Sequence, residues 1–211
     1  MKRISTQSLR GLYILTDERL GTHLESVTTA ALKGGARLVQ YRDKSADAGK
    51  CEREARALCA LTHGHGALFL VNDDPALAAK VGADGVHLGR DDPEISSARR
   101  LLGIDAIIGV SCYDSLALAR DAVGAGADYV AFGSVYPSPV KPDAVRAPLD
   151  LLTQAKRELG VPVCAIGGIT PENAMPVIAA GADMLAVVSA IVFADDPQAV
   201  SRAFLHLLEV A

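Results

Sequence analysis

The sequence predicts an α/β protein built as one closed (β/α)8 barrel, and three observations lead to this fold class. Short apolar runs recur at fairly regular intervals along the chain. Alanine-rich amphipathic segments lie between these runs, and glycine-containing turns close most of the segments. Strand and helix patterns that alternate in this way are typical of βαβ units, which place parallel strands side by side in one sheet.

The apolar runs are nearly continuous, as in strands that are buried on both faces. They are residues 12–15, 38–41, 68–71, 85–88, 107–110, 129–132, 161–166 and 185–188. Because these strand–helix units account for nearly the whole chain, we expect residues 1–211 to form a single TIM-barrel domain. An open doubly wound sheet is the alternative, but it would leave two edges exposed and usually has fewer strands.

Helices are expected between the runs, for example at 26–33, 50–61, 115–123 and 151–159. A capping side chain stands directly before a proline, as at the start of a helix, in Asp74-Pro75, Asp92-Pro93 and Thr170-Pro171. A recurrent helix-to-strand turn is indicated by the stretches GGAR (34–37), VGADGV (81–86), AGADYV (125–130) and AGADML (180–185). Pro176 should kink its helix or delay the regular start of that helix.

Composition excludes several classes of protein. The net charge of -4 and a pI near 5.7 argue against a nucleic-acid partner or an anionic membrane surface. No apolar run approaches the ~20 residues of a membrane span, and the first ten residues lack the apolar segment of a secretory signal. The four cysteines, Cys51, Cys59, Cys112 and Cys164, show no CxxC spacing, which favours free thiols in a reducing cytoplasm. A homo-oligomer is compatible with the sequence, which does not determine the number of subunits.

Polar residues follow the second run at a point where the barrel should open. Gln40, Arg42 and Lys44 alternate along the chain, so an extended strand would direct all three to one face. An amide and two cations directed into the barrel mouth would bind a polyanion such as a diphosphate. The alternative is an ion-paired strand end that involves Asp43, but such an inward cluster is costly unless it is used.

Carboxylates follow the third and fourth runs. Asp74 is expected to cap a helix, whereas Asn72 and Asp73 stand directly at the strand end. Asp92, taken alone, fits a helix N-cap better than a ligand. Beside Asp73 on the adjacent strand, however, it would complete a carboxylate pair of the kind that binds Mg²⁺ together with phosphate and water. His87 lies within its strand and is interpreted as a core histidine.

The later runs predict a second anion site. Ser111 could hydrogen-bond a substrate, but no adjacent histidine and acid would make it a nucleophile. Gly167 and Gly168 after the seventh run, with Ser189 after the eighth, are typical of a backbone phosphate site. Lys141, on a proline-braced loop after the sixth run, would be a further anion ligand. Two such sites indicate the joining of two phosphorylated substrates, or transfer between them, with diphosphate as leaving group.

These residues together closely resemble the thiamine phosphate synthase family. The resemblance covers almost the entire chain in order, through GLYILTD (11–17), QYRDK (40–44), VNDDPALA (71–78), GVHLGRDD (85–92), GVSC (109–112), YVAFGSVYPSPVK (129–141), AIGGITPEN (165–173) and VVSAI (187–191). It implies a (β/α)8 transferase that joins 4-amino-5-hydroxymethyl-2-methylpyrimidine diphosphate to 4-methyl-5-(2-hydroxyethyl)thiazole phosphate, or its carboxylated tautomer. The products would be thiamine phosphate and diphosphate. The implied mechanism is a Mg²⁺-assisted, dissociative substitution.

The resemblance also implies a role for each site residue. The pyrimidine diphosphate would be held by Gln40, Arg42, Lys44, Asn72 and Lys141, with Ser111 near the reacting centre. The thiazole phosphate would be surrounded by Ser138, Gly168, Val188 and Ser189. Mg²⁺ would be bound by Asp73 and Asp92. Arg42, Ser111 and Lys141 are the residues implied to assist the reaction itself.

Three positions depart from the family pattern. Val140 stands where a threonine is usual, and its missing hydroxyl would weaken phosphate binding by on the order of 1 kcal/mol. Tyr113 replaces a frequent histidine, and Arg90 replaces a frequent glutamine and adds a cation if it points inward.

Two other functions are weighed against the synthase. A thiazole tautomerase-like isomerase would share the fold and the phosphate end, but such proteins tend to lack the diphosphate and metal residues. A non-catalytic phosphate-binding barrel would have no use for the carboxylates. The presence of Arg42, Asp73 and Asp92 therefore favours the synthase.

Overall fold

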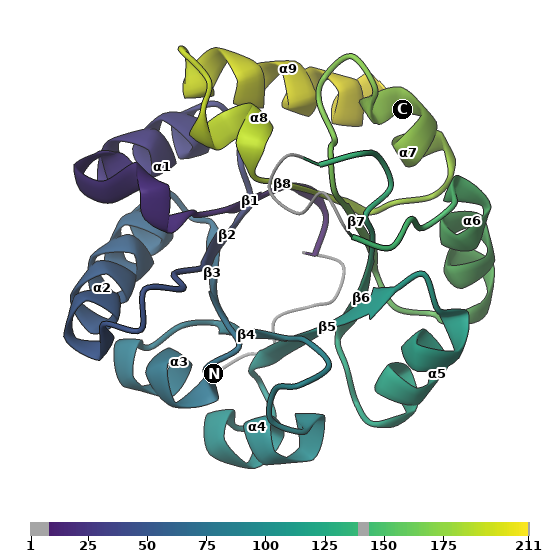
Figure 1. The fold of residues 1–211 in the computed structure, drawn as a ribbon, viewed down its shortest axis with the longest axis horizontal. Helices are drawn as coiled ribbons and strands as arrows, with labels where there is room; N and C mark the ends of the chain where they lie inside the picture. The colour runs from purple at the N-terminus through teal and green to yellow at the C-terminus, as the bar shows by residue number, and fades with distance from the viewer. Residues whose placement is uncertain (1–8, 139–143, 211) are drawn as a thin grey trace.

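The eight predicted strands form a closed parallel barrel in which each strand pairs with the next and β8 pairs with β1 (Figure 1). The computed structural model describes residues 9–138 and 144–210. The strands are β1 Gly11–Leu15, β2 Leu38–Tyr41, β3 Leu68–Asn72, β4 Gly85–Leu88, β5 Ile107–Tyr113, β6 Tyr129–Phe132, β7 Val163–Ile166 and β8 Met184–Val187. Every predicted apolar run thus overlaps a strand, and the expected barrel is confirmed.

Helices surround the barrel as an outer ring (Figure 1). They are η2 Glu18–His23, α1 Leu24–Lys33, α2 Ala48–Gly64, α3 Pro75–Val81, α4 Ile95–Leu102, α5 Leu116–Gly124, α6 Leu149–Glu158, α7 Ala174–Ala179, α8 Ser189–Val192 and α9 Pro197–Val210. α9 packs against α1 and β1, so the last helix covers the seam where the first and last strands meet. Across these described parts of the chain, no helix is long and apolar enough to cross a membrane.

Only one of the three predicted proline-marked helix starts is confirmed. Asp74 caps α3, and its carboxylate accepts the Leu77 N–H at 2.9 Å. Asp92 and Thr170 are not caps, because α4 and α7 begin several residues further along the chain. Pro176 lies in the first turn of α7, where a missing N–H removes no intrahelical bond. Of the two expected effects of Pro176, the structure therefore shows a delayed helix start and not a kink.

The repeated Gly-Ala-Asp turns hold together the end of the barrel at which the strands begin. We call this the lower end, and the end with the cavity the upper end. Each aspartate accepts a main-chain N–H from the preceding strand, in the pairs Asp84–Phe69 at 2.7 Å, Asp128–Ile108 at 2.8 Å and Asp183–Val163 at 2.8 Å. Each also contacts a basic side chain of the helix that comes before that strand, in the pairs Asp84–His63 at 2.8 Å, Asp128–Arg99 at 2.6 Å and Asp183–Lys156 at 2.6 Å. We call these three aspartates the aspartate clamps, because each ties a strand to its neighbouring unit.

The core has two parts, one inside the barrel and one between the barrel and the helices. The inner part includes Tyr13, Leu38, Leu70, Tyr129 and Met184, all of which are almost fully buried. The outer part is larger and is formed by apolar side chains of the strands and the facing helices. All four cysteines are free thiols, as predicted.

Candidate active site

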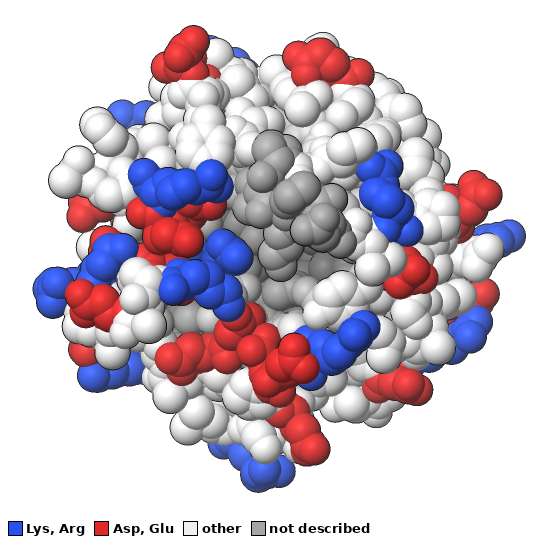
Figure 2. All heavy atoms as spheres, viewed as in Figure 1, with Lys and Arg blue, Asp and Glu red and all other residues white. Residues whose placement is uncertain are grey.

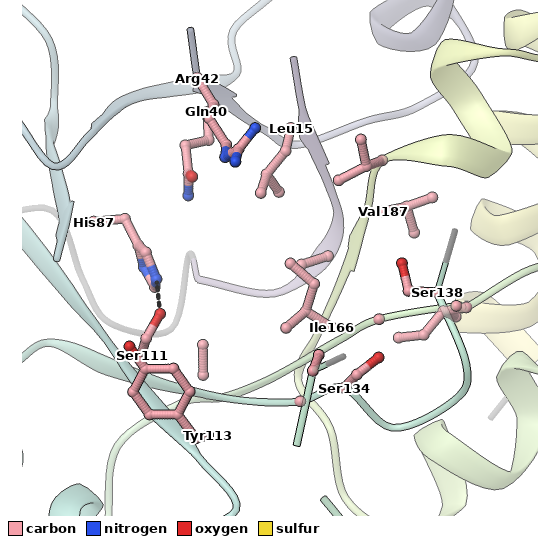
Figure 3. Close-up of a pocket in the computed structure, with 18 of the residues that line it drawn as sticks. Leu15, Gln40, Arg42, His87, Ser111, Tyr113, Ser134, Ser138, Ile166 and Val187 are labelled. Carbon is pink, nitrogen blue, oxygen red and sulfur yellow. Dashed lines mark hydrogen bonds between the residues drawn. The ribbon is translucent and has the colours of Figure 1, made fainter. Parts of the chain in front are cut away.

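A cavity of about 440 Å³ opens at the end of the barrel where the strands end (Figure 3). Eight of the residues predicted from the sequence line it, namely Gln40, Arg42, Asn72, Ser111, Ser138, Gly168, Val188 and Ser189. Figure 3 shows Gln40 and Arg42 on one wall and Ser138 across the cavity from them. Residues expected at both anion sites therefore line one continuous cavity.

Gln40 and Arg42 lie on the β2 side of this cavity. Gln40 is 1% exposed and donates from Nε2 to the Tyr13 hydroxyl at 2.5 Å. Its Oε1 atom has no hydrogen-bond partner among the residues that the structure describes. The main chain at Arg42 is fixed by Thr16, whose hydroxyl accepts the Arg42 N–H at 2.8 Å and donates to the Arg42 carbonyl oxygen at 3.2 Å.

Lys44 does not line the cavity, which corrects the expectation that it shares an inward face with Gln40 and Arg42. β2 ends at Tyr41, so the alternation of side chains does not extend to residue 44. The Lys44 ammonium instead lies 2.5 Å from an Asp73 carboxylate oxygen. Lys44 is therefore placed beside the predicted metal ligands at the rim.

Asp73 and Asp92 form a carboxylate pair at the rim over β3 and β4. Asp73 adopts a left-handed main-chain conformation with a φ of 64°, and its N–H donates to the His87 carbonyl oxygen at 2.8 Å. The Asp92 carboxylate accepts the Gly89 N–H at 2.6 Å, which closes the loop after β4. This bond replaces the helix cap that Asp92 would have made. The two carboxyl groups also lie within hydrogen-bonding reach of each other, so a proton on Asp92 would join them.

The interaction between Asp73 and Asp92 moves their pKa values in opposite directions. Burial and the hydrogen bond to Asp73 raise the pKa of Asp92. Burial also opposes ionisation of Asp73, but hydrogen bonds from Asp92 and Lys44 outweigh it and lower the Asp73 pKa. The pair thus competes for one proton, and a divalent cation would relieve the repulsion between two ionised carboxylates. Figure 2 shows acidic and basic side chains side by side around this part of the opening.

A chain of polar side chains crosses the barrel beneath the cavity. The two ring nitrogens of His87 contact the Tyr129 hydroxyl at 2.8 Å and the Ser111 hydroxyl at 2.9 Å. Gly109 makes room for this chain, because a Cβ atom there would lie 2.0 Å from the Tyr129 ring. His87 is buried and bonded at both ring nitrogens, as its interpretation as a core histidine predicts, and it also lines the cavity. The available signal was a polar residue inside an apolar strand, the same signal that identified Gln40.

The opposite wall consists of the glycine turn after β7 and the start of α8 after β8. Gly168 has a φ of 65°, and a Cβ atom there would lie 2.2 Å from the Pro137 carbonyl oxygen. Only glycine therefore fits beneath the segment that leads to Ser138. Asn173 holds the turn from both sides, since it donates to the Gly168 carbonyl oxygen at 2.9 Å and accepts the Thr170 N–H at 2.8 Å. The sequence analysis had assigned no role to Asn173.

Comparison with known proteins identifies the family. The family model described as thiamine monophosphate synthase matches residues 12–191. The thiamine-phosphate synthase of Thioalkalivibrio sulfidiphilus is 57% identical over 97% of this chain and 98% of its own length. That of Chromobacterium violaceum is 54% identical over 92% of this chain and 94% of its own length. A solved structure of the thiamine phosphate pyrophosphorylase from Pyrococcus furiosus has a TM-score of 0.88 at 38% identity, covering 97% of this chain and 98% of that one.

The chain belongs to the thiamine monophosphate synthase family. It is accordingly an enzyme of the transferase class, as the sequence analysis predicted. The resemblance that motifs alone had indicated is confirmed over the whole barrel.

Two of the three departures from the family pattern occur side by side in the cavity wall. The Arg90 guanidinium lies over the Tyr113 ring at 4.7 Å, and the Arg90 N–H donates to the Tyr113 hydroxyl at 3.3 Å. Both residues line the cavity. Arg90 therefore adds a cation to the lining, and Tyr113 supplies the surface on which that cation rests.

Two residues named in the sequence analysis lie outside the described residues. They are Lys141, the predicted anion ligand, and Val140, the third departure from the family pattern. Their roles remain sequence-based predictions.

Proposed function

We propose that this protein is a thiamine-phosphate synthase that joins 4-amino-5-hydroxymethyl-2-methylpyrimidine diphosphate to 4-methyl-5-(2-hydroxyethyl)thiazole phosphate, or to its carboxylated tautomer. The products are thiamine phosphate and diphosphate, together with CO₂ when the carboxylated tautomer is the substrate. The observation that carries the proposal is one cavity with Arg42 and Asn72 on its β2–β3 side and a glycine turn on its β7–β8 side, next to a rim where Lys44 pairs with Asp73. This arrangement, in a chain of this family, suits two phosphorylated substrates held end to end. We treat residues 1–211 as one catalytic domain, and the free thiols support a cytoplasmic location.

Mg²⁺ is the proposed metal, and the carboxylate pair fits it. Asp73 and Asp92 lie within hydrogen-bonding reach of each other, and Lys44 is the one cation that contacts the pair among the ion pairs described here. The described residues contain no group of three His, Cys, Asp or Glu side chains that could hold a metal by themselves. A site with so few protein ligands suits Mg²⁺, which keeps waters and takes substrate phosphate oxygens. Bound Mg²⁺ would neutralise the negative charge that the leaving diphosphate gains.

The cationic side chains complete the pyrimidine diphosphate site. Arg42 lines the cavity and presents a planar guanidinium that suits two phosphate oxygens at once. Lys44 stands at the rim beside Asp73 and adds a point charge. Asn72 ends β3 next to them and offers an amide. Lys141, from the loop after β6, is proposed to bind the same substrate.

The thiazole phosphate is proposed to bind on the other wall. Gly168 and the first residues of α8 supply main-chain N–H groups, and Ser189 and Ser138 add hydroxyls. Val188 is the residue before α8 and also lines the cavity. This wall is largely uncharged, so directional hydrogen bonds replace the cations used at the diphosphate side.

The reaction is proposed to be driven by departure of the leaving group. Diphosphate leaves first with the bonding electron pair, and the aminopyrimidine ring stabilises the positive charge left on its methylene carbon. The thiazole nitrogen then forms the new carbon–nitrogen bond. No proton needs to be removed from the thiazole nitrogen, which agrees with a lining whose histidine is bonded on both ring nitrogens.

A coupled-substrate assay tests the function directly. The purified protein is mixed with both substrates, with and without Mg²⁺, and thiamine phosphate and diphosphate are followed together. Equal, Mg²⁺-dependent formation of both products is expected. Isomerisation of the thiazole carboxylate without coupling would instead indicate a tautomerase-like enzyme, and binding of phosphate ligands without turnover a non-catalytic barrel.

A further inference from the structure

Five polar side chains from five different strands form one hydrogen-bonded chain through the barrel interior. It runs from Gln40 to Tyr13 at 2.5 Å, to Tyr129 at 3.0 Å, to His87 at 2.8 Å and to Ser111 at 2.9 Å. Both tyrosines are almost fully buried. The inside of such a barrel is normally filled with branched apolar side chains, so this polar chain needs a reason. We call it the polar relay.

The two ends of the polar relay open into the active-site cavity. Gln40 and Ser111 both line the cavity, whereas Tyr13 and Tyr129 do not. Gln40 Oε1 is buried and has no partner in the described parts of the chain. A buried carbonyl oxygen of this kind is costly when it is unpaired, so a ligand that donates a hydrogen bond would satisfy it. Figure 3 shows Gln40 and the His87–Ser111 hydrogen bond, which are the two ends of the relay, in the lining of the cavity.

The hydroxyl and ring hydrogens of the relay link the hydrogen-bonding roles of its two ends, Gln40 and Ser111. When Gln40 donates to Tyr13, the single hydroxyl hydrogen of Tyr13 is directed to Tyr129, and that of Tyr129 is directed to His87 Nδ1. His87 then carries its proton on Nε2 and donates to Ser111. The Ser111 hydroxyl hydrogen is left to donate into the cavity, while Gln40 presents its carbonyl oxygen.

All hydrogen bonds of the relay can also run in the opposite direction. In that case the donor and acceptor roles at both ends are exchanged together. A Gln40 amide turned by 180° would accept from Tyr13, and every later bond would reverse until Ser111 donates to His87. Gln40 would then present its NH₂ group and Ser111 only its oxygen lone pairs. With a neutral His87, the cavity can therefore present an acceptor at Gln40 with a donor at Ser111, or the reverse, whereas a mixed state leaves one buried relay group unpaired.

We propose that Tyr13, Tyr129 and His87 are positioning residues that couple recognition of the leaving group to recognition of the pyrimidine ring. The inference rests on the proposed function. We place the diphosphate against Ser111, which lines the cavity. A fully ionised diphosphate can only accept hydrogen bonds, so it requires Ser111 to donate. This requirement fixes the direction of the polar relay, and Gln40 must then present its carbonyl oxygen. That oxygen accepts from an exocyclic amino group and repels an oxo group at the same position.

Binding measurements with four ligands test this coupling. Two are the 4-amino and 4-oxo forms of the pyrimidine diphosphate, and two are the corresponding alcohols without diphosphate. Dissociation constants are measured by calorimetry in Mg²⁺ without the thiazole substrate. The proteins are the wild type and the Tyr13→Phe and Tyr129→Phe variants, which keep the rings and remove one hydroxyl each. Tyr41→Phe is the matched control, because Tyr41 is a buried tyrosine outside the relay whose hydroxyl donates to Glu54 at 2.8 Å.

In the wild type and Tyr41→Phe, we expect the amino diphosphate to bind about 100-fold more tightly than the oxo diphosphate. The two alcohols should differ by less than about tenfold, because a hydroxyl can donate as well as accept and leaves the relay free to reverse. In Tyr13→Phe and Tyr129→Phe, the diphosphate preference should fall below about tenfold. Thermal unfolding confirms that each variant is folded.

Two results overturn the inference while leaving the proposed function intact. One is an unchanged amino preference in both folded relay variants. The other is an equal preference for the diphosphates and the alcohols in the wild type, which needs no variant at all. Failure of the wild type to bind or turn over the amino diphosphate would overturn the proposed function, and this inference with it.

Discussion

The two ends of the barrel use the same residue type in opposite ways. At the lower end, each of the aspartate clamps accepts a main-chain N–H and contacts a basic side chain, so each carboxylate has two partners within the protein. At the upper end, Asp73 and Asp92 lie within hydrogen-bonding reach of each other, with one exposed lysine as their neighbour. The clamps are complete without a ligand, whereas the carboxylate pair is not.

This difference separates stability from function along the barrel axis. A carboxylate that already has its hydrogen bonds and its counter-charge stabilises the fold and has little left to offer a ligand. Two carboxylates close together raise the free energy of the metal-free protein and lower it again when a cation binds. The three predictions below compare the same Asp→Asn change at the two ends.

The largest effect is expected on activity at the upper end. Asp73→Asn and Asp92→Asn should each lower kcat/KM by about 10³-fold, because a neutral amide does not attract a divalent cation. Asparagine tolerates the left-handed main chain at Asp73, so the fold should persist. The measurement is steady-state kinetics over a Mg²⁺ titration.

The lower end supplies the controls for this experiment. Asp128→Asn and Asp183→Asn should keep kcat/KM within about threefold of the wild type at temperatures where they are folded, because both lie far from the cavity lining. Near-normal activity in both upper variants would rule out the carboxylate pair as the metal site.

The second effect is expected on stability at the lower end. Asp128→Asn should lower the free energy of unfolding by about 2 kcal/mol, because Arg99 and the Ile108 N–H lose a charged partner in a mostly buried site. Asp183→Asn should cost about 1 kcal/mol, since its partner Lys156 is 46% exposed and solvent screens the pair. Urea unfolding measures both values. Equal stability of the two variants and the wild type would show that the clamps do not hold the barrel.

The sequence predicted the barrel well because buried parallel strands leave a local signal. Each strand is a short apolar run, and the residues that follow it are carried to the cavity by the fold. Gln40, Arg42 and Asn72 could therefore be placed correctly from their position relative to a run. Lys44 could not, since nothing in the local pattern marks Tyr41 as the last residue of β2.

Interactions between distant residues account for what the sequence did not predict. Tyr13 and Tyr129 are 116 positions apart and meet only because β1 and β6 face each other inside the barrel. Asp92 shows the same limit at short range. Its position before a proline is typical of a helix cap, but the Gly89 N–H and the nearby Asp73 carboxyl determine what it contacts.

The smallest expected effect is an increase in stability from an Asp→Asn change at the upper end, whereas the same change at the lower end should decrease stability. In metal-free protein at pH 7, Asp92→Asn should raise the free energy of unfolding by about 0.5–1 kcal/mol, or Tm by about 1–4 °C. An asparagine can still accept the Gly89 N–H and donate to Asp73 without a second charge. Added Mg²⁺ should stabilise the wild type and not the variant, as scanning calorimetry with chelator or with Mg²⁺ will show.

The pH dependence of this difference follows from the pKa of Asp92, which burial and Asp73 raise above 3.8 in the folded protein. Between 3.8 and the raised value, the folded state binds more protons at this group than the unfolded state does. Wild-type stability from Asp92 therefore increases as the pH falls through the raised pKa. The advantage of Asp92→Asn should be largest at neutral pH and should disappear toward acidic pH. A variant that is less stable than the wild type in chelator at pH 7 would show that the pair is not strained, and the contrast between the two ends would fail.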